Sequence, residues 1–284
     1  MRIYEMESSK KGKFFLAAEF EKRVSAYEST TGRKLGEYST HFQSGGKRMC
    51  IADSGKYFAA AAYSRFGITL FELVTGAELW TTKEVKRVQR ICFSADETML
   101  FAINEDNKLY KISLTDGSVI SVENGIKKIF SNHPLDVKLT KNECLIWNEV
   151  SASLTDKKVL CLCFGNNKVF CTIMCGGIMC FSENGNELWY AENKFEEHYV
   201  KLCYCPKFDF IIGLGYKYGS SRTEPFYFTD AYSAEKGNII FSVGLRDDSV
   251  YTFIDNGESI VSGTGKVYTL SENGYILNEK HFNM

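Results

Sequence analysis

The sequence has few prolines and histidines, almost no net charge and no long apolar run. It contains 3 prolines and 4 histidines among 284 residues, and its formal net charge is −1. A chain this close to neutral lacks the bulk charge that binds nucleic acid or an anionic membrane, so we expect neither partner. No stretch approaches the roughly 18 uninterrupted apolar residues that a membrane-spanning helix needs. Near the start, Glu5 and Glu7 stand where a signal peptide would have its apolar segment, which predicts that the protein is not exported.

The 10 cysteines lie in apolar surroundings and do not suggest a disulfide scaffold. Two of them occur in the runs Met49-Cys50-Ile51 and Ile91-Cys92-Phe93. Because 44% of the residues are apolar, the chain can build a core without covalent cross-links. We therefore expect reduced cysteines in the core and a cytoplasmic location.

Short runs rich in Val, Ile, Phe, Tyr and Thr alternate with Gly, Asn, Asp and Ser along the whole chain. This alternation predicts strands joined by tight turns, and the scarcity of proline agrees with it. One turn type lies between two apolar runs, as in Asp53-Ser54-Gly55-Lys56, with the glycine-free variant Ser94-Ala95-Asp96-Glu97. A second type carries a glycine after a polar residue, as in Thr75-Gly76 and Asp116-Gly117. Glycine suits both turns because hairpin turns need positive φ.

The strands are grouped into units with a period of about 41 residues. The first strands of the units align in one column: Tyr4, Cys50, Cys92, Phe130, Cys161, Cys203 and Tyr251. Each unit has room for four strands, which in the second unit we place at Arg48–Ala52, Tyr57–Tyr63, Ile68–Leu73 and Glu78–Thr82. A repeat of this length with four strands is typical of a β-propeller blade. The sequence predicts an all-β protein, a seven-bladed β-propeller of four-stranded antiparallel blades, with residues 1–284 in a single domain.

Two features of this ring need separate expectations. The fourth unit, 126–156, lacks a clear glycine turn, and if it is an insertion the number of blades is six. The chain begins on an inner strand, Arg2–Met6, and finishes on an outer one, Tyr275–Phe282. We therefore expect the first and last blades to close by side-chain packing, without exchange of a strand.

Three segments carry a resemblance to a known group of propellers. They are D-S-G-K-Y-F-A after Ala52, V-T-G-A-E-L-W at Val74–Trp80 and E-N-G-N-E-L-W at Glu183–Trp189. Together they resemble the YVTN and quinoprotein-like branch of the WD-repeat-like propellers, over nearly the whole chain. The resemblance implies that the T/N-G-x-x-x-W segment docks an aromatic side chain between neighbouring blades. In other units that position falls near Tyr38, Ile120 and Phe241. The resemblance implies no quinone-binding or catalytic residue.

Residues that could carry chemistry have a structural interpretation here. The pairs Cys161-Leu162-Cys163 and Cys203-Tyr204-Cys205 occupy equivalent strands, where both sulfurs face one side, so core packing is favoured over a metal or redox site. The 4 histidines are not spaced as metal ligands. Asp53, Asp96 and Asp255 occupy equivalent turns, where a short carboxylate caps its own backbone. The basic runs Lys10–Lys13 and Lys83–Arg90 are interpreted as solvated surface. We predict no catalytic residue, no metal ligand and no cofactor.

The sixth unit contains the one elaborated connection. Its strands Phe210–Leu214 and Phe226–Thr229 are separated by Gly215–Pro225, whereas the corresponding connections elsewhere are short. Long loops on rigid scaffolds often carry function, although a tolerated insertion is the alternative. This loop is expected on the face that also carries Ser64-Arg65-Phe66. The candidate residues for binding a partner are Arg65, Phe66, Tyr216, Tyr218 and Arg222, because such side chains provide large, hydrogen-bonding contact areas.

The leading hypothesis is a non-enzymatic binding or scaffold propeller that engages a protein partner through its loop-bearing face. The alternative is a lactonase- or lyase-like enzyme with a metal or small-molecule site at the central channel, which would need carboxylates, histidines or amides converging from several blades. A small-molecule ligand at the channel mouth is a third hypothesis. The two main hypotheses differ in whether the purified protein carries a stoichiometric metal.

Overall fold

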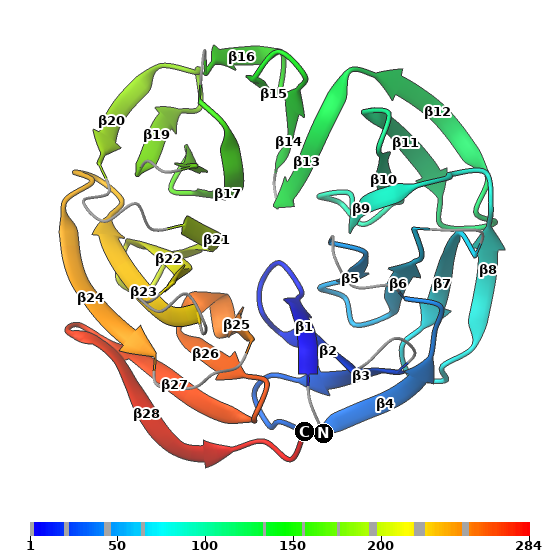
Figure 1. Ribbon diagram of the computed structural model, residues 1–284, viewed down its shortest axis with the longest axis horizontal. Helices are drawn as coiled ribbons and strands as arrows, with labels where there is room; N and C mark the ends of the chain where they lie inside the picture. Colours follow the sequence, from blue (N-terminus) through cyan, green and yellow to red (C-terminus); the bar gives the residue numbers. More distant parts are fainter. Residues whose placement is uncertain are drawn as a thin grey trace.

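The chain forms seven sheets arranged in a ring around a central axis (Figure 1). The computed structural model describes residues 3–19, 23–42, 47–63, 66–132, 135–154, 157–174, 177–192, 198–218, 225–245 and 250–284. Each sheet has four antiparallel strands, named A to D from the innermost to the outermost, and consecutive strands are neighbours in every sheet. The prediction of a seven-bladed β-propeller is confirmed.

The strands follow one another blade by blade. Blades one to four contain β1 (Ile3–Ser8), β2 (Phe14–Glu19), β3 (Arg23–Glu28), β4 (Lys34–Ser39); β5 (Met49–Ile51), β6 (Tyr57–Ala61), β7 (Ile68–Glu72), β8 (Glu78–Thr82); β9 (Val88–Phe93), β10 (Met99–Asn104), β11 (Lys108–Ser113), β12 (Val119–Asn124); and β13 (Ile126–Asn132), β14 (Leu135–Thr140), β15 (Cys144–Trp147), β16 (Val150–Ser153). Blades five to seven contain β17 (Val159–Gly165), β18 (Lys168–Ile173), β19 (Ile178–Ser182), β20 (Glu187–Ala191); β21 (His198–Cys205), β22 (Phe210–Tyr218), β23 (Pro225–Ser233), β24 (Ile239–Leu245); and β25 (Tyr251–Ile254), β26 (Ser259–Ser262), β27 (Lys266–Ser271), β28 (Gly274–His281), with a 3-10 turn η1 (Asp255–Gly257) after β25.

The fourth blade is complete, so the six-bladed alternative is wrong. Its four strands β13 to β16 form a sheet like the others. In the second blade the strands agree with the predicted ones or are one or two residues shorter at an end. The difference arises where a terminal residue belongs to the turn: the N–H of Ala52, for example, closes its turn by bonding to the carbonyl of Tyr57 at 3.0 Å.

The sixth blade differs more from the prediction. Residues Gly215–Tyr218, which we expected in a loop, continue β22, and Pro225 begins β23, so the two strands pair as far as Tyr218 and Pro225. Glycine in this segment suggested a break in the strand. The neighbouring Gly213 nevertheless lies inside β22, and the Tyr199 ring occupies the space where a side chain at this position would lie. A β-carbon at Gly213 would lie 2.5 Å from that ring. Only residues 219–224 separate the strands, and they lie outside the described part of the chain.

Neighbouring blades are fixed by aromatic side chains on their outer strands. The indole N–H of Trp80 on β8 donates to the carbonyl of Leu114 in the next blade at 2.9 Å, and its ring covers Gly117. Trp189 on β20 makes the same contacts with Ala234 and Gly237. In the first blade the Tyr38 hydroxyl donates to the carbonyl of Leu73. The expected docking of an aromatic between blades is therefore confirmed.

The ring closes between the seventh and first blades without exchange of a strand, as expected. Ile3, Phe15 and Tyr27 pack with Ile254, Val261 and Phe282 in one buried cluster. Two main-chain bonds, each 3.0 Å, add to this packing: the N–H groups of Asp255 and Asn256 donate to the carbonyls of Gly12 and Lys11. The two ends of the chain lie beside each other at this seam (Figure 1).

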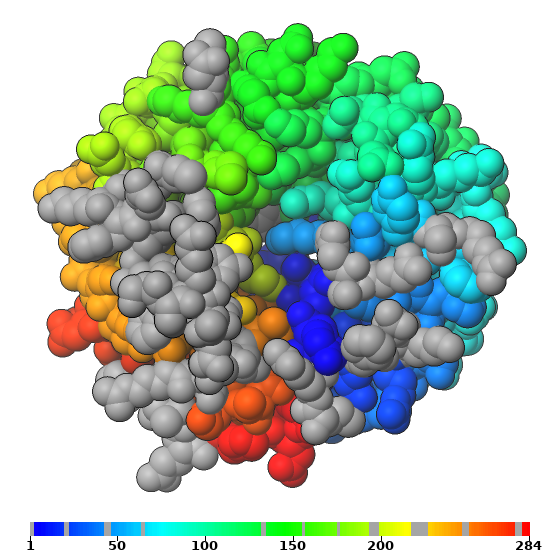
Figure 2. Space-filling view, viewed as in Figure 1, coloured from blue at the N-terminus to red at the C-terminus, as the bar shows by residue number. Residues whose placement is uncertain are grey.

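The antiparallel order gives the ring two distinct faces. A–B and C–D connections emerge on one face, called here the A–B face, and B–C and D–A connections emerge on the other, the B–C face. The seven inner strands, from β1 to β25, surround the axis (Figure 1), and the ring is hollowed at its centre (Figure 2). Within the described residues, no helix has the length and hydropathy needed to cross a bilayer.

Candidate functional site

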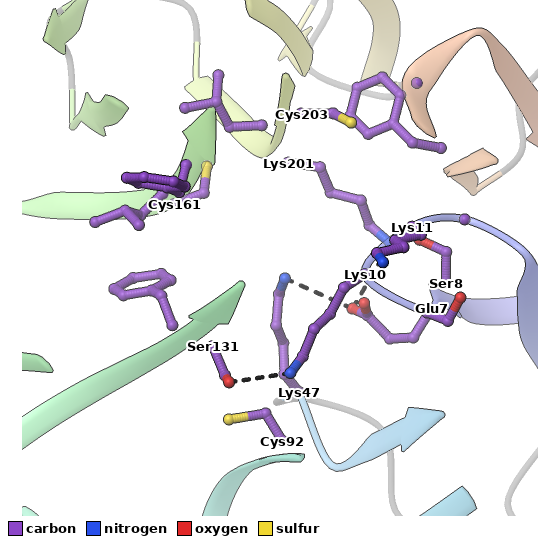
Figure 3. A pocket seen from close by; sticks show the side chains of 18 of the residues that line it. Glu7, Ser8, Lys10, Lys11, Lys47, Cys92, Ser131, Cys161, Lys201 and Cys203 are labelled. Atoms are coloured by element: carbon purple, nitrogen blue, oxygen red, sulfur yellow. Dashed lines mark hydrogen bonds and ion pairs between the residues drawn. The ribbon is translucent and has the colours of Figure 1, made fainter. Parts of the chain in front are cut away.

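A cavity of about 340 Å³ lies on the axis, at the end of the channel next to the A–B turns (Figure 3). Residues from the inner strand of every blade contribute to its lining, together with A–B turn residues of blades one, six and seven. Its volume falls in the range of small-molecule sites. Most of the lining residues lie on strands, which fix their side chains more rigidly than loops do.

The lining is dominated by positive charge. One carboxylate, that of Glu7, is exposed to the cavity, and the cations around it are Lys10, Lys11, Lys47, Arg90 and Lys201. Figure 3 shows the ammonium groups of Lys47 and Lys201 directed toward Glu7, from which they lie 3.7 and 3.6 Å away. Burial opposes ionisation of Glu7, but these lysines and Arg90 hold the pKa of its carboxyl below the ordinary value. Glu7 is therefore ionised, and it neutralises only a small part of the surrounding charge.

Four of the inner strands carry a cation at one equivalent position, two residues before Cys50, Cys92, Phe130 and Cys203. We call these residues the inner cation ring: Arg48, Arg90, Lys128 and Lys201. Burial lowers the pKa of all four, and with the neighbouring charge of Arg90 it brings that of Lys128 to about 8. The centre of the propeller is thus a region of positive potential.

Three members of the inner cation ring are satisfied by the backbone of another blade. Arg48 donates to the Val88 carbonyl at 2.8 Å, Lys128 to the Val159 carbonyl at 2.6 Å and Lys201 to the Met6 carbonyl at 2.5 Å. Arg90 differs, because its guanidinium lies over the Phe130 ring, 5.1 Å from the centroid, and has no hydrogen-bond acceptor among the described residues. It lies in the lining of the cavity.

The interpretation of both basic runs as solvated surface is wrong for two residues. Lys10 reaches across the channel, where its ammonium group donates to the Ser94 carbonyl at 2.6 Å and to the Ser131 hydroxyl at 3.2 Å (Figure 3). Arg90 lies on β9 and lines the cavity. The pleat of the inner strand turns it inward, whereas Lys83 and Lys86, in the connection before β9, are exposed.

The cysteines that line the cavity are neutral thiols. Burial raises the pKa of Cys92 to about 11 and that of Cys203 to about 12, and it raises the pKa of Cys161 as well. A thiol in this state is a poor nucleophile and a poor metal ligand. The nine cysteines that the structure describes are all unpaired, in agreement with the core role predicted for them.

The donor set suits an anion better than a metal ion. In the described part of the chain, no group of three His, Cys, Asp or Glu side chains is placed to hold a metal. A divalent cation in the channel would face five cations and a single carboxylate, and this arrangement repels it. The cavity lining therefore gives no support to the metal-dependent enzyme hypothesis.

Five acids in or next to the A–B turns join neighbouring blades, a role that their sequence did not indicate. An oxygen of each accepts a hydrogen bond from the turn of the preceding blade: Lys11 N–H to Asp53 at 2.8 Å, Ser54 N–H to Glu97 at 3.2 Å, Ala95 N–H to Asp136 at 2.9 Å, Asn166 to Asp209 at 3.3 Å and Lys207 to Glu258 at 2.7 Å. We call this set the turn belt. The predicted self-capping is confirmed for Asp96, which accepts from Thr98 N–H at 3.1 Å, and is wrong for Asp53.

Of the residues predicted to bind a partner, Phe66, Tyr216 and the backbone of Tyr218 are described, and they lie at the B–C end of their blades. Phe66 is half-buried and stacks on His41, with centroids 4.0 Å apart. Tyr216 is also half-buried, and its ring packs against that of Tyr227, with centroids 6.3 Å apart. Arg65 and Arg222 lie outside the described residues, and for Tyr218 the structure describes the backbone of β22 but not the side chain. Phe66 is in blade two and Tyr216 in blade six, so the structure does not bring them into one cluster.

The projecting part of blade six is supported by a series of tyrosines. The ring centroids of Tyr227 and Tyr251 are 5.2 Å apart, and those of Tyr251 and Tyr268 in the seventh blade are 6.2 Å apart. Tyr251 and Tyr268 are buried. The β22–β23 hairpin, with nine residues in each strand, is therefore anchored to the neighbouring blade rather than standing alone.

Exposed apolar side chains do not define another site. They are spread over the outer strands of several blades, as with Leu79, Ile120, Leu188 and Ile239. Isolated apolar residues of this kind are normal on protein surfaces.

Similarity to known structures agrees with this geometry. No protein-family model matches the sequence, and no curated protein matches it. Among solved structures, Hsv2 of Kluyveromyces marxianus is 10% identical, with a TM-score of 0.80 over 100% of this chain and 99% of that one. This likeness supports the β-propeller fold. The C-terminal WD40 domain of Sif2 is 10% identical, with a TM-score of 0.67 over 97% and 80% of the two chains. BamB of Moraxella catarrhalis is 11% identical, with a TM-score of 0.62 over 99% and 91%. At these identities the likeness describes the fold alone.

Proposed function

We propose that this propeller is a non-enzymatic binding module that engages a protein partner through its B–C face. The observation that carries the proposal is the β22–β23 hairpin, whose strands of nine residues extend beyond the five or six residues found in most other blades. Strands that are anchored before binding lose little conformational entropy when a partner binds them. The contacts of Tyr227, Tyr251 and Tyr268 anchor the hairpin in this way.

The expected contact residues of this face are those predicted from the sequence. Tyr216, Tyr218 and Arg222 belong to the hairpin or its tip, and Arg65 and Phe66 to the corresponding connection of blade two. Tyrosine and arginine are frequent hot-spot residues, each worth on the order of 2 kcal/mol when buried at an interface. Because the two groups lie on separate blades, a partner that uses both spans the channel mouth.

The test is affinity purification of the tagged full chain from its native cells, compared with two variants. One variant replaces Tyr216, Tyr218 and Arg222 by alanine. The matched control replaces Lys13 and Lys56, exposed residues of the A–B face, by alanine. The proposal requires a protein that the wild type and the control retain and the hairpin variant loses. It is wrong if the hairpin variant, with an unchanged melting temperature, retains every partner.

We also propose that the protein works in the reducing environment of the cytoplasm. The support is that the nine described cysteines are unpaired and mostly buried. Disulfides form in oxidising compartments, where so many thiols would be a liability. Quantifying free thiols in protein isolated under alkylating conditions tests this, since an intramolecular disulfide would contradict it.

A further inference from the structure

The axial cavity has properties that the binding of a protein on the B–C face does not use. It lies at the A–B end of the channel, and its cations come from the inner strands β9 and β21, the A–B turn of blade one and the residue Lys47 just before β5. Two of these cations, Arg90 and Lys201, lie on inner strands, which hold their side chains in place. The question is what chemistry such a cavity recognises.

The charge of the lining is not balanced by the protein. Lys10, Lys11, Lys47, Arg90 and Lys201 surround Glu7, and no other carboxylate lines the cavity in the part of the chain that the structure describes. The nearby Glu5 does not restore the balance, because burial and the charge of Glu7 raise its pKa to about 7. The cysteines of the lining are neutral. The more buried of these cations, such as Lys201, cost stability unless an anion accompanies them.

The nearby acids that could have neutralised these cations are used elsewhere. Asp53, Glu97 and Asp136 accept hydrogen bonds in the turn belt, from N–H groups of the preceding blades. Within the cavity, Lys47 has only the 3.7 Å contact with Glu7, and Lys10 bonds to uncharged oxygens. Arg90 lies in the lining and has no hydrogen-bond acceptor among the described residues. These three groups are available to an anion.

We propose that the axial cavity binds a small molecule that carries two or more phosphate groups. Phosphate fits the donors, because the fork of Arg90 can bond two of its oxygens while ammonium groups act as point charges beside it. A single phosphate carries about two negative charges, fewer than the lining offers. The volume of about 340 Å³ suits a compact ligand, in the range of ordinary small-molecule sites.

Isothermal titration calorimetry on the full chain tests this, with inorganic triphosphate as the probe at about 20 mM salt, where screening is weak. Inorganic phosphate and citrate are the comparison ligands. Triphosphate is expected to bind at least about tenfold more tightly than either. The proposal is overturned if triphosphate does not bind below about 1 mM, or if citrate binds as tightly, since the site would then recognise charge rather than phosphate.

Variants locate the binding. Lys47→Gln and Arg90→Gln are each expected to weaken triphosphate binding at least about tenfold, the typical effect of losing a charged hydrogen bond. The matched control is Lys86→Gln, which changes the net charge equally but lies in the exposed connection before β9, at the other end of the channel. Equal weakening by the control and the cavity variants would refute an axial site.

A gain of affinity provides a result that misfolding cannot imitate. Glu7→Gln removes the carboxylate that competes for Lys47 and Lys201, so triphosphate is expected to bind at least about threefold more tightly. Weaker binding by this variant, with its melting temperature within a few degrees of the wild type, would overturn the proposal. Because the site and the hairpin lie at opposite ends of the channel, partner retention and triphosphate binding fail independently.

Discussion

Glu5 and Glu7, two residues apart on β1, are expected to have opposite effects on stability. Burial, followed by the charge of Glu7, raises the pKa of Glu5 from 4.5 to about 7. One of its carboxylate oxygens is buried and has no hydrogen-bond partner among the described residues. Glu7 has a lowered pKa, because Lys201, Lys47 and Arg90 together outweigh its burial. One acid therefore prefers to be neutral in the folded state, and the other prefers to be charged.

The sign of each effect follows from linkage. The folded state holds the proton of Glu5 more tightly than the unfolded state, so the free energy of unfolding falls as the pH rises from 4.5 toward 7. A shift of this size is worth about 3 kcal/mol in all. Glu5→Gln removes the titration and is expected to be more stable than the wild type at about pH 8, by up to about 3 kcal/mol, with no difference near pH 4.5. Glu7→Gln is expected to be less stable at the same high pH, and its deficit disappears as the pH falls through the folded pKa of Glu7.

Urea unfolding followed by tryptophan fluorescence measures both effects, since Trp80, Trp147 and Trp189 each donate to a carbonyl of the neighbouring blade. Subtracting the wild-type free energy of unfolding at each pH removes the contribution of all other titrating groups. In the double variant the benefit of Glu5→Gln should shrink, because Glu7 is one cause of the raised pKa of Glu5. The reasoning is refuted if Glu5→Gln destabilises the protein at high pH, or if the two single variants shift the free energy of unfolding in the same direction.

Three further predictions follow from the packing. Gly117→Ala is expected to cost about 2–4 kcal/mol, because φ is +74° and the new β-carbon would lie 2.7 Å from the neighbouring indole. Gly125→Ala, with φ +81° and only an ordinary contact of 3.9 Å to the Lys141 side chain, should cost only about 1 kcal/mol, and equal costs by urea unfolding would contradict the indole contact. Asp53→Ala should speed hydrogen exchange at the amide of Lys11, which bonds to that carboxylate, and Asp53→Asn should do so less. Cys92 should resist iodoacetamide in the native protein at about pH 8 and react in urea, because burial raises its pKa to about 11; rapid native labelling by mass spectrometry would refute this.

The architecture was predictable because a propeller repeats one four-stranded unit, whose strands and turns are set by local sequence. The aligned residues from Tyr4 to Tyr251 fall on the seven inner strands. Glycine turns of the second type, such as Thr75-Gly76, join strands C and D. The glycine-free turn also works, since Glu97 adopts φ +57° in its place. Each of these features is set by residues close in sequence, so a single sequence suffices to show them.

The site was missed because its residues are distant in sequence and ambiguous alone. Lys10 finds its acceptors 84 and 121 residues away, and Asp53 bonds to a residue 42 positions earlier. A local signal did exist: the alignment that gave the cysteine column also places Arg48, Arg90, Lys128 and Lys201 two positions before it. A cation repeated in register on inner strands indicates a charged channel. The sequence could not show that Arg90 would lack a carboxylate partner, since that depends on where the fold places the acidic side chains of the other blades.

The net charge of −1 conceals a separation of charge within the fold. Near-neutral composition argued against polyanionic macromolecules, and that argument concerns the field of the whole surface. Inside the channel the field is set by a few side chains that are partly removed from solvent, where each charge interacts more strongly than at the surface. In the turn belt, Asp53, Glu97 and Asp136 accept hydrogen bonds from backbone N–H groups, so these acids do not neutralise the cations on the axis. A ring of blades can therefore be neutral as a whole and still concentrate positive charge where a small anion would bind.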